Sequence, residues 1–191
     1  MSPEKFLSSS VWVARVKTFF QAMDVDRDGF LSLSDYEHTA DRLVELGGDP
    51  SRSQEIQELF RALFKNMMAG GAPVDGNTKI SEEECVANAA KAVTLVESAR
   101  EVARRKNEVF FDIIDTDNSG EISSEEYRKY LAIYFGEEDS DRADQAFNSI
   151  DVDGNGSISR DEFIEGHIHY WFEDGSDPSF FPLPYGPLVA Q

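Results

Sequence analysis

"DVDGNGSISRDE", residues 151–162, is the stretch that decides the fold. Oxygen-bearing side chains stand at positions 1, 3, 5, 9 and 12 of this segment, and glycine stands at position 6. The same pattern recurs in "DVDRDGFLSLSD" (24–35) and in "DTDNSGEISSEE" (115–126). Oxygen ligands at this spacing can wrap one Ca2+ ion, a hard cation that takes about six to eight of them. Three copies of the pattern make chance acidic turns a poor explanation.

Each segment resembles the calcium-binding loop of an EF-hand, which is a helix–loop–helix structure. In such a loop the main-chain carbonyl at position 7 joins the side-chain ligands, and position 9 often acts through water. Glycine at position 6 allows a sharp turn, because glycine tolerates a positive φ. The predicted metal ligands are Asp24, Asp26, Asp28, Phe30, Ser32 and Asp35; Asp115, Asp117, Ser119, Glu121, Ser123 and Glu126; and Asp151, Asp153, Asn155, Ser157, Ser159 and Glu162.

Apolar residues at helical spacing flank every loop. Ahead of the first loop these are Val13, Val16, Phe19, Phe20 and Met23, and "GGDP" (47–50) ends the helix that follows it. Comparable apolar stretches precede and follow the other two loops, and a long helix is expected near 97–114.

A fourth helix–loop–helix is predicted around "PVDGNTKISEEE" (73–84). When Ile80 is aligned with the eighth position of the other loops, Pro73 takes the first ligand position and Thr78 takes the glycine position. Proline has no side-chain oxygen, so we expect this loop to bind no cation and to support the first site structurally. A remodelled loop that uses main-chain carbonyls of "GGAPVDG" (70–76) stays as the alternative.

The four helix–loop–helix units predict an all-α fold arranged as two pairs, with short β-bridges between paired loops. Leu31 is expected to face Ile80 across one bridge, and Ile122 is expected to face Ile158 across the other. The expected domains are residues 1–96, with one active and one degenerate loop, and residues 97–191, with two active loops and a C-terminal tail.

The chain is strongly acidic, with 37 Asp and Glu against 18 Lys and Arg and a formal charge of −19. This charge disfavours nucleic acid and anionic membranes as partners. The single cysteine, Cys85, excludes an internal disulfide and suits a reducing compartment. No apolar run reaches the roughly 20 residues of a membrane span, and the first ten residues lack the apolar core of a signal peptide. We therefore expect a monomeric cytoplasmic protein, with signal-independent export as the alternative.

Over nearly its full length, the chain resembles the invertebrate sarcoplasmic calcium-binding proteins and the related coelenterazine-binding proteins and calcium-regulated photoproteins. The resemblance rests on four EF-hands with a degenerate second one, on "WVARVKTFFQAMDVDRDGF" (12–30) and on "PYGPLVAQ" (184–191). It implies that the two halves pack face to face in one globule and that the C-terminal segment packs into the body. The apolar composition of residues 172–191 also favours burial, which would fill the groove that a calcium sensor offers to a target helix.

The leading functional hypothesis is a calcium buffer, with Ca2+/Mg2+ exchange as an extension. One Cys and three His leave no complete nucleophilic arrangement, so no enzymatic activity is expected. Two alternatives stay open: a coelenterazine-binding or photoprotein-like protein with an internal pocket, and a calcium sensor that binds a partner helix.

The photoprotein alternative depends on three aromatic residues. His167, Trp171 and Tyr185 resemble the C-terminal His–Trp–Tyr set of the photoproteins in order and spacing. Lys106 and Tyr127 stand where the photoproteins have tryptophan, and Val16 stands where they have a first-helix histidine, which speaks against that function. A core role is expected for His167, and surface positions are expected for His38 and His169.

The first loop differs from the other two at position 12. It ends in Asp35, whose side chain is one methylene shorter than that of Glu126 or Glu162. A shorter carboxylate is expected to reach the ion with one oxygen, which lowers the coordination number toward the six that Mg2+ requires. We therefore predict Ca2+ at all three loops and competition by Mg2+ at 24–35.

Overall fold

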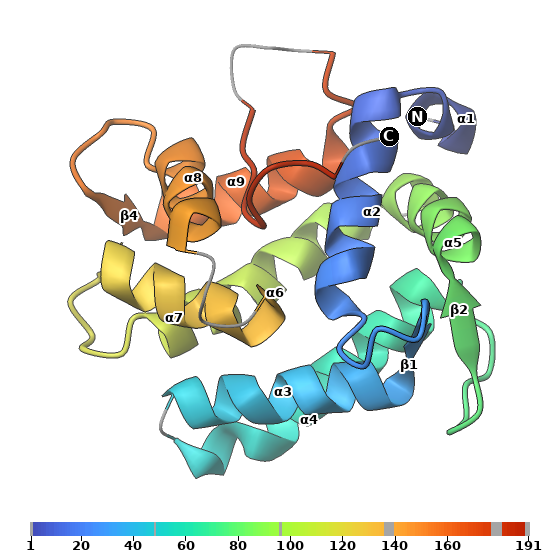
Figure 1. Cartoon of the computed structure of the whole chain (residues 1–191), viewed down its shortest axis with the longest axis horizontal. Helices are drawn as coiled ribbons and strands as arrows, with labels where there is room; N and C mark the ends of the chain where they lie inside the picture. Colours follow the sequence, from blue (N-terminus) through green and yellow to red (C-terminus); the bar gives the residue numbers. More distant parts are fainter. Residues whose placement is uncertain (1, 48, 96, 136–139, 177–180, 190–191) are drawn as a thin grey trace.

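The computed structural model describes residues 2–47, 49–95, 97–135, 140–176 and 181–189 (Figure 1). The first half contains α1 (Pro3–Leu7), α2 (Ser10–Met23), β1 (Phe30–Ser32), α3 (Leu33–Gly47), the 3-10 turn η1 (Pro50–Arg52), α4 (Ser53–Leu63), the π-helical turn η2 (Phe64–Met68), β2 (Lys79–Ser81) and α5 (Glu82–Leu95). The second half contains α6 (Glu97–Ile114), β3 (Glu121–Ser123), α7 (Ser124–Phe135), α8 (Ser140–Ile150), β4 (Ser157–Ser159) and α9 (Arg160–Phe172).

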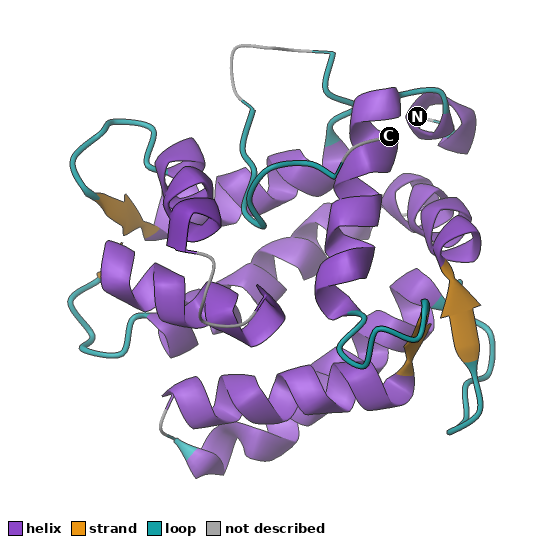
Figure 2. Ribbon diagram, viewed as in Figure 1, coloured by secondary structure: helices purple, strands orange, loops and turns teal. Residues whose placement is uncertain are grey.

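The predicted all-α class is confirmed, and helices dominate the ribbon in Figure 2. α2 begins where the hydroxyl of Ser9 accepts a hydrogen bond from the main-chain N–H of Trp12 at 3.1 Å, as expected of a serine N-cap. It ends at Met23, one residue before the first predicted ligand. Three elements were not predicted: α1, the 3-10 turn η1, and the π-helical turn that continues α4.

Two antiparallel bridges join the loops in pairs, β1 with β2 and β3 with β4. Leu31 faces Ile80 in the first bridge, and Ile122 faces Ile158 in the second, as predicted. All four side chains point into the core. Each bridge therefore fixes two loops to the hydrophobic interior.

The two halves share one core. α3 packs against α6 and α7 of the other half, and α2 packs against α9. Figure 1 shows α2 and α6 crossing the middle of the molecule, with loops at its edges. Cys85 is fully buried in this core, and burial raises the pKa of its thiol to about 12. No helix among the described residues is both long and apolar enough to cross a membrane.

The described part of the C-terminal tail packs between the two halves, as expected. The Tyr127 hydroxyl of α7 donates to the carbonyl of Pro184 at 2.9 Å. The main-chain N–H of Leu183 donates to Ser149 of α8 at 2.8 Å, and that of Val189 donates to Thr18 of α2 at 3.0 Å. The tail therefore ties α2 to the helices of the second half, and Figure 1 shows it (red) passing between them.

Candidate calcium sites

The three predicted loops share a backbone geometry that sequence reasoning captured only in part. The expected positive φ occurs at position 6, with values of 84° at Gly29, 88° at Gly120 and 88° at Gly156. Position 4 is also left-handed: φ is 57° at Arg27, 55° at Asn118 and 70° at Gly154. Of these three residues, only Asn118 and Gly154 are of types that favour a left-handed backbone. The sequence therefore indicated this turn in two loops, but Arg27 gave no such indication in the first.

Main-chain N–H groups hold the first carboxylate of each loop. In the third helix–loop–helix, the two oxygens of Asp115 accept from the N–H groups of Ser119 and Gly120, both at 2.9 Å. Asp151 accepts from Asn155 at 3.1 Å and from Gly156 at 3.0 Å, and Asp24 accepts from Asp28 and Gly29 at 3.2 and 3.0 Å. The turn that positions 4 and 6 create thus places one acidic side chain inside each loop.

The last carboxylate of each loop closes the loop. Glu126 accepts from the N–H groups of Thr116 and Ser123 at 2.8 and 2.9 Å. Glu162 accepts from Val152 and Ser159, both at 2.9 Å, and forms a capping box with Ser159 at the start of α9. Helix formation and loop closure therefore depend on the same glutamate.

The acidic side chains converge as a hard divalent cation requires. Three clusters bring their carboxylate oxygens within 4.8 Å of one another. Asp115, Asp117 and Glu126 form one cluster, and Asp151, Asp153 and Glu162 form another. An all-oxygen donor set of this kind fits Ca2+ better than zinc or copper, which favour nitrogen or sulfur.

The remaining predicted ligands lie in the same loops. Asn155 accepts from the N–H of Ser157 at 2.8 Å, and the Ser119 hydroxyl donates to the main-chain carbonyl of Glu121, the predicted seventh-position ligand, at 2.9 Å. Ser123 and Ser159 each donate a hydroxyl to the glutamate at position 12, at 2.8 and 2.7 Å.

The pKa values of the carboxylates in the loops shift in different directions. Burial raises the pKa of Asp24, and the nearby charges of Asp35 and Asp26 add to it, against hydrogen bonds from the main chain. For Glu126, burial acts to raise the pKa, but hydrogen bonds from Ser123 and Thr116 outweigh it and the pKa is lowered. A divalent cation would remove the like-charge repulsion around Asp24.

The first loop differs in which carboxylates converge. Its cluster consists of Asp24, Asp26 and Asp28 and does not include Asp35. Asp35 is buried and accepts hydrogen bonds from the N–H groups of Val25 at 3.1 Å and Ser32 at 2.8 Å, the same loop positions that donate to Glu126 and Glu162. All three carboxylates at position 12 thus contact the loop backbone, but only the longer glutamates also belong to the acidic cluster of their loop.

A lysine from the fourth loop also reaches this site. Lys79, on β2, makes an ion pair with Asp28 across the bridge, and that contact lowers the pKa of Asp28. Sequence analysis missed it, because the partners are 51 positions apart in the chain.

The loop 73–84 is held closed by its own hydrogen bonds. Asp75 accepts from the N–H of Asn77 at 2.9 Å, and Glu84 accepts from the N–H of Ser81 at 2.9 Å. All residues of this loop are described, and no three of its acidic side chains form a cluster.

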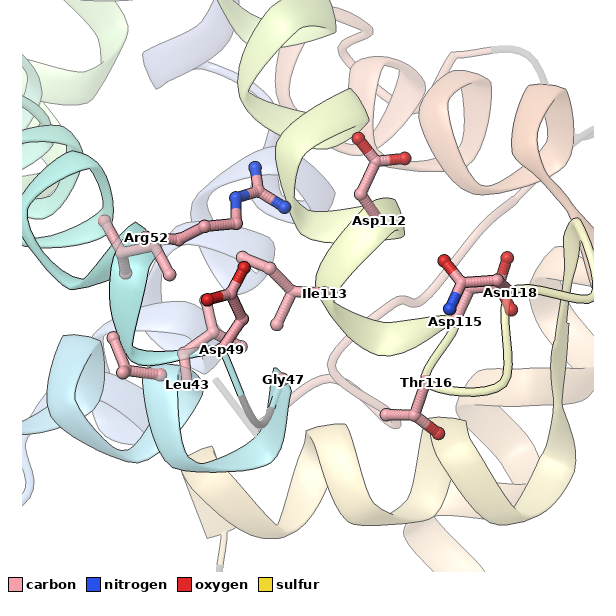
Figure 3. A pocket seen from close by; sticks show the side chains of 11 residues that line it. Leu43, Gly47, Asp49, Arg52, Asp112, Ile113, Asp115, Thr116 and Asn118 are labelled. Atoms are coloured by element: carbon pink, nitrogen blue, oxygen red, sulfur yellow. The ribbon is translucent and has the colours of Figure 1, made fainter.

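A polar hollow of about 260 Å³ lies beside the third loop, between it and the end of α3 (Figure 3). Its charged side chains already have partners: Arg52 pairs with Glu55 at 3.0 Å, and Asp112 pairs with Arg160 at 2.7 Å. At Gly47, one of its lining residues, an added Cβ would lie 2.9 Å from the side chain of Ile113, two residues before Asp115. Beside the hollow, α3 and α6 therefore approach closely at Gly47.

The histidines follow the expectations in part. His38 is exposed, but His169 is half-buried rather than on the surface, because α9 is covered on most sides by α2, α6 and the tail. His167 is fully buried, and its Nδ1 lies 2.8 Å from the carbonyl of Phe163. Burial, with Lys106 as a second cause, lowers the pKa of His167 to about 3, so this ring is a neutral core residue.

Comparison with known proteins agrees with the loop geometry. An EF-hand domain pair model matches residues 104–166, and an EF hand model matches residues 16–38. The sarcoplasmic calcium-binding protein of Hediste diversicolor is 28% identical over 134 residues, which are 67% of this chain and 70% of that protein. Among solved structures, okadaic acid binding protein 2.1 has a TM-score of 0.74 over 95% of this chain and 98% of its own, at 19% identity, which shows a shared fold.

Two proteins from Renilla are also similar to this chain. The calcium-loaded apo form of the coelenterazine-binding protein from Renilla muelleri has a TM-score of 0.67 and 28% identity, covering 98% of this chain and 99% of its own. The luciferin-binding protein of Renilla reniformis is 31% identical over 136 residues, which are 70% of this chain and 71% of that protein. The chain is therefore an EF-hand calcium-binding protein and belongs to the family that contains the sarcoplasmic calcium-binding proteins, the coelenterazine-binding proteins and the photoproteins.

Proposed function

We propose that the protein is a monomeric cytoplasmic calcium buffer without catalytic activity, and that it binds three Ca2+ ions, at 24–35, 115–126 and 151–162. The observation that carries the buffer role is the buried tail. Its main chain bonds to α2, α7 and α8, and Tyr185 is 1% exposed. A sensor must open a groove for its target, and this tail would have to leave first.

Calorimetric titration with Ca2+, in the presence and absence of Mg2+, tests the stoichiometry. Three binding events are expected, and a fourth would mean that the loop beginning at Pro73 binds a cation. A hydrophobic dye then separates buffer from sensor. A buffer shows little change in dye fluorescence on adding Ca2+, whereas a large calcium-dependent rise would contradict the buffer role.

We also propose that 24–35 is the site at which Mg2+ competes. Asp35 is the shortest carboxylate at position 12 and stays outside the acidic cluster of its loop, which favours single-oxygen coordination and about six ligands. Replacing Asp35→Glu should reduce Mg2+ affinity and increase preference for Ca2+ at this loop. The matched variant Glu162→Asp should have the opposite effect at the last loop. Equal Mg2+ competition at all three wild-type loops would contradict this assignment.

A luciferin-binding role is the second candidate, because Trp171 and Tyr185 line an internal apolar cavity. Lys106 lines the same cavity, and a charged amine disfavours a large neutral aromatic ligand. Titration with coelenterazine under calcium and under chelator tests this role, and saturable binding at one equivalent would support it over a pure buffer.

A further inference from the structure

The interior holds an apolar cavity of about 360 Å³, separate from the calcium loops. α2, α4, α5, α6 and α9 all contribute to its wall. Its lining is mostly aromatic and aliphatic and includes Phe19, Met23, Phe60, Phe110, Trp171 and Phe172. One lining residue, Val102 of α6, is 59% exposed and marks a way in from solvent. The volume lies in the range of small-molecule pockets.

Lys106 is the single charged residue in that lining. Its Nζ lies 5.2 Å from the centre of the Phe110 ring, and Phe110 is 2% exposed. On the same helix, Arg104 pairs with Glu165 at 2.6 Å and Arg105 pairs with Glu101 at 3.2 Å. Among the described residues, Lys106 has no such carboxylate partner.

Lys106 is half-buried, and an ammonium group that lines an apolar cavity without a carboxylate partner is costly. Burial lowers the pKa of Lys106 to about 8, so most of the amine is still protonated at neutral pH. A bound anion would compensate this charge, and the apolar walls would accept a hydrocarbon chain. A neutral ligand of the same size would satisfy the walls and leave the ammonium group unpaired.

We propose that the cavity binds an apolar carboxylic acid, a fatty acid of about twelve carbons by its volume, whose carboxylate pairs with Lys106. The hydrocarbon chain would lie against Phe60, Phe110 and Trp171. This ligand class follows from Lys106 and is independent of the proposed buffer function.

The test is calorimetric titration of the calcium-loaded full-length protein with dodecanoate below its micelle concentration, and in parallel with its methyl ester below the solubility limit of the ester. Dodecanoate should bind roughly tenfold or more tightly than the ester, as expected for a charge-assisted hydrogen bond. In Lys106→Met, which keeps most of the length of the side chain without its charge, this preference should disappear. Ester binding should persist in that variant.

Two further variants control for folding and location. Lys65→Met removes an exposed lysine next to the lining residue Asn66 and should bind both ligands as the wild type does. Ala103→Phe places a ring in the cavity and should weaken both ligands together. Calcium titration and thermal melting check that each variant is folded. Absent binding, equal binding of acid and ester, an unchanged preference in Lys106→Met, or full binding in Ala103→Phe would each overturn the proposal.

Discussion

Replacing Tyr185→Ala tests how strongly the tail holds the two halves together. The side chain is 1% exposed and meets three aromatic rings edge-to-face, with ring centres 5.4 Å from Phe19, 5.5 Å from Tyr170 and 5.8 Å from His167. These rings come from α2 and α9, so truncation opens a void between elements of both halves.

The expected cost follows from the burial. Replacing a fully buried aromatic side chain by alanine costs about 3 to 5 kcal/mol in free energy of unfolding. In a chain of 191 residues, each kcal/mol shifts the melting temperature by about 2 to 4 °C. The variant should therefore melt roughly 6 to 20 °C below the wild type, at saturating Ca2+ in both samples so that bound metal contributes equally.

Differential scanning calorimetry measures this shift, and a hydrophobic dye reports the exposed interior. Leu188→Ala, at a half-buried tail position, is the matched control and should cost less than about 2 kcal/mol. If Tyr185→Ala melts no lower than this control and binds no extra dye, the tail is not a structural part of the core.

Four smaller predictions address the loops and the core. Chelating the metal should lower the melting temperature by roughly 15 to 30 °C, because each of the three proposed sites contributes about 2.7 kcal/mol when free Ca2+ is a hundredfold above Kd. An unchanged calorimetric trace would contradict this. Lys79→Met should raise the Ca2+ affinity of the first loop roughly severalfold at low salt and less at high salt, since it removes a cation paired with Asp28; titration calorimetry at two salt concentrations decides. Arg27→Gly should stabilise the calcium-loaded protein by about 1 kcal/mol in urea unfolding, because φ at Arg27 is 57°. Burial lowers the pKa of His167 to about 3 in the folded chain, so the unfolded chain binds a proton more readily and stability falls as pH drops below about 6.5. Relative to His167→Gln, the wild type should lose about 2 kcal/mol in free energy of unfolding between pH 7 and pH 5.

The sequence predicted best those features that residues close together in the chain determine. A twelve-residue loop contains its own ligands and its own turn, so Asp115, Gly120 and Glu126 could be assigned without a fold. The bridge register followed because the eighth position is apolar in all four loops, including Ile80. Burial of the tail followed from its composition, and the contacts of Tyr185 bear it out.

What the sequence did not reveal depends on residues brought together from far apart. Arg15 lies in an amphipathic stretch and is fully buried. Its Nη1 donates to the carbonyl of Glu173 at 3.0 Å, just past the end of α9, where exposed carbonyls favour a cation. The half-buried position of His169 has the same origin, because neighbouring helices and not local sequence decide which faces of α9 are covered.

The loop at 73–84 helps to explain how one degenerate loop can remain useful beside an active one. Its strand β2 pairs with β1, so Ile80 and Leu31 enter the core together and hold the carbonyl of Phe30 and the side chain of Ser32 in register. Both are predicted ligands of the first site. The same strand carries Lys79, which neutralises part of the acidic cluster when it contacts Asp28. An isolated loop would lack the fixed register, and without Lys79 its four acidic ligands would repel one another more strongly in the metal-free state. The proposed metal site at 24–35 would therefore depend on the pair, because β2 fixes the register of ligands that the first loop alone supplies.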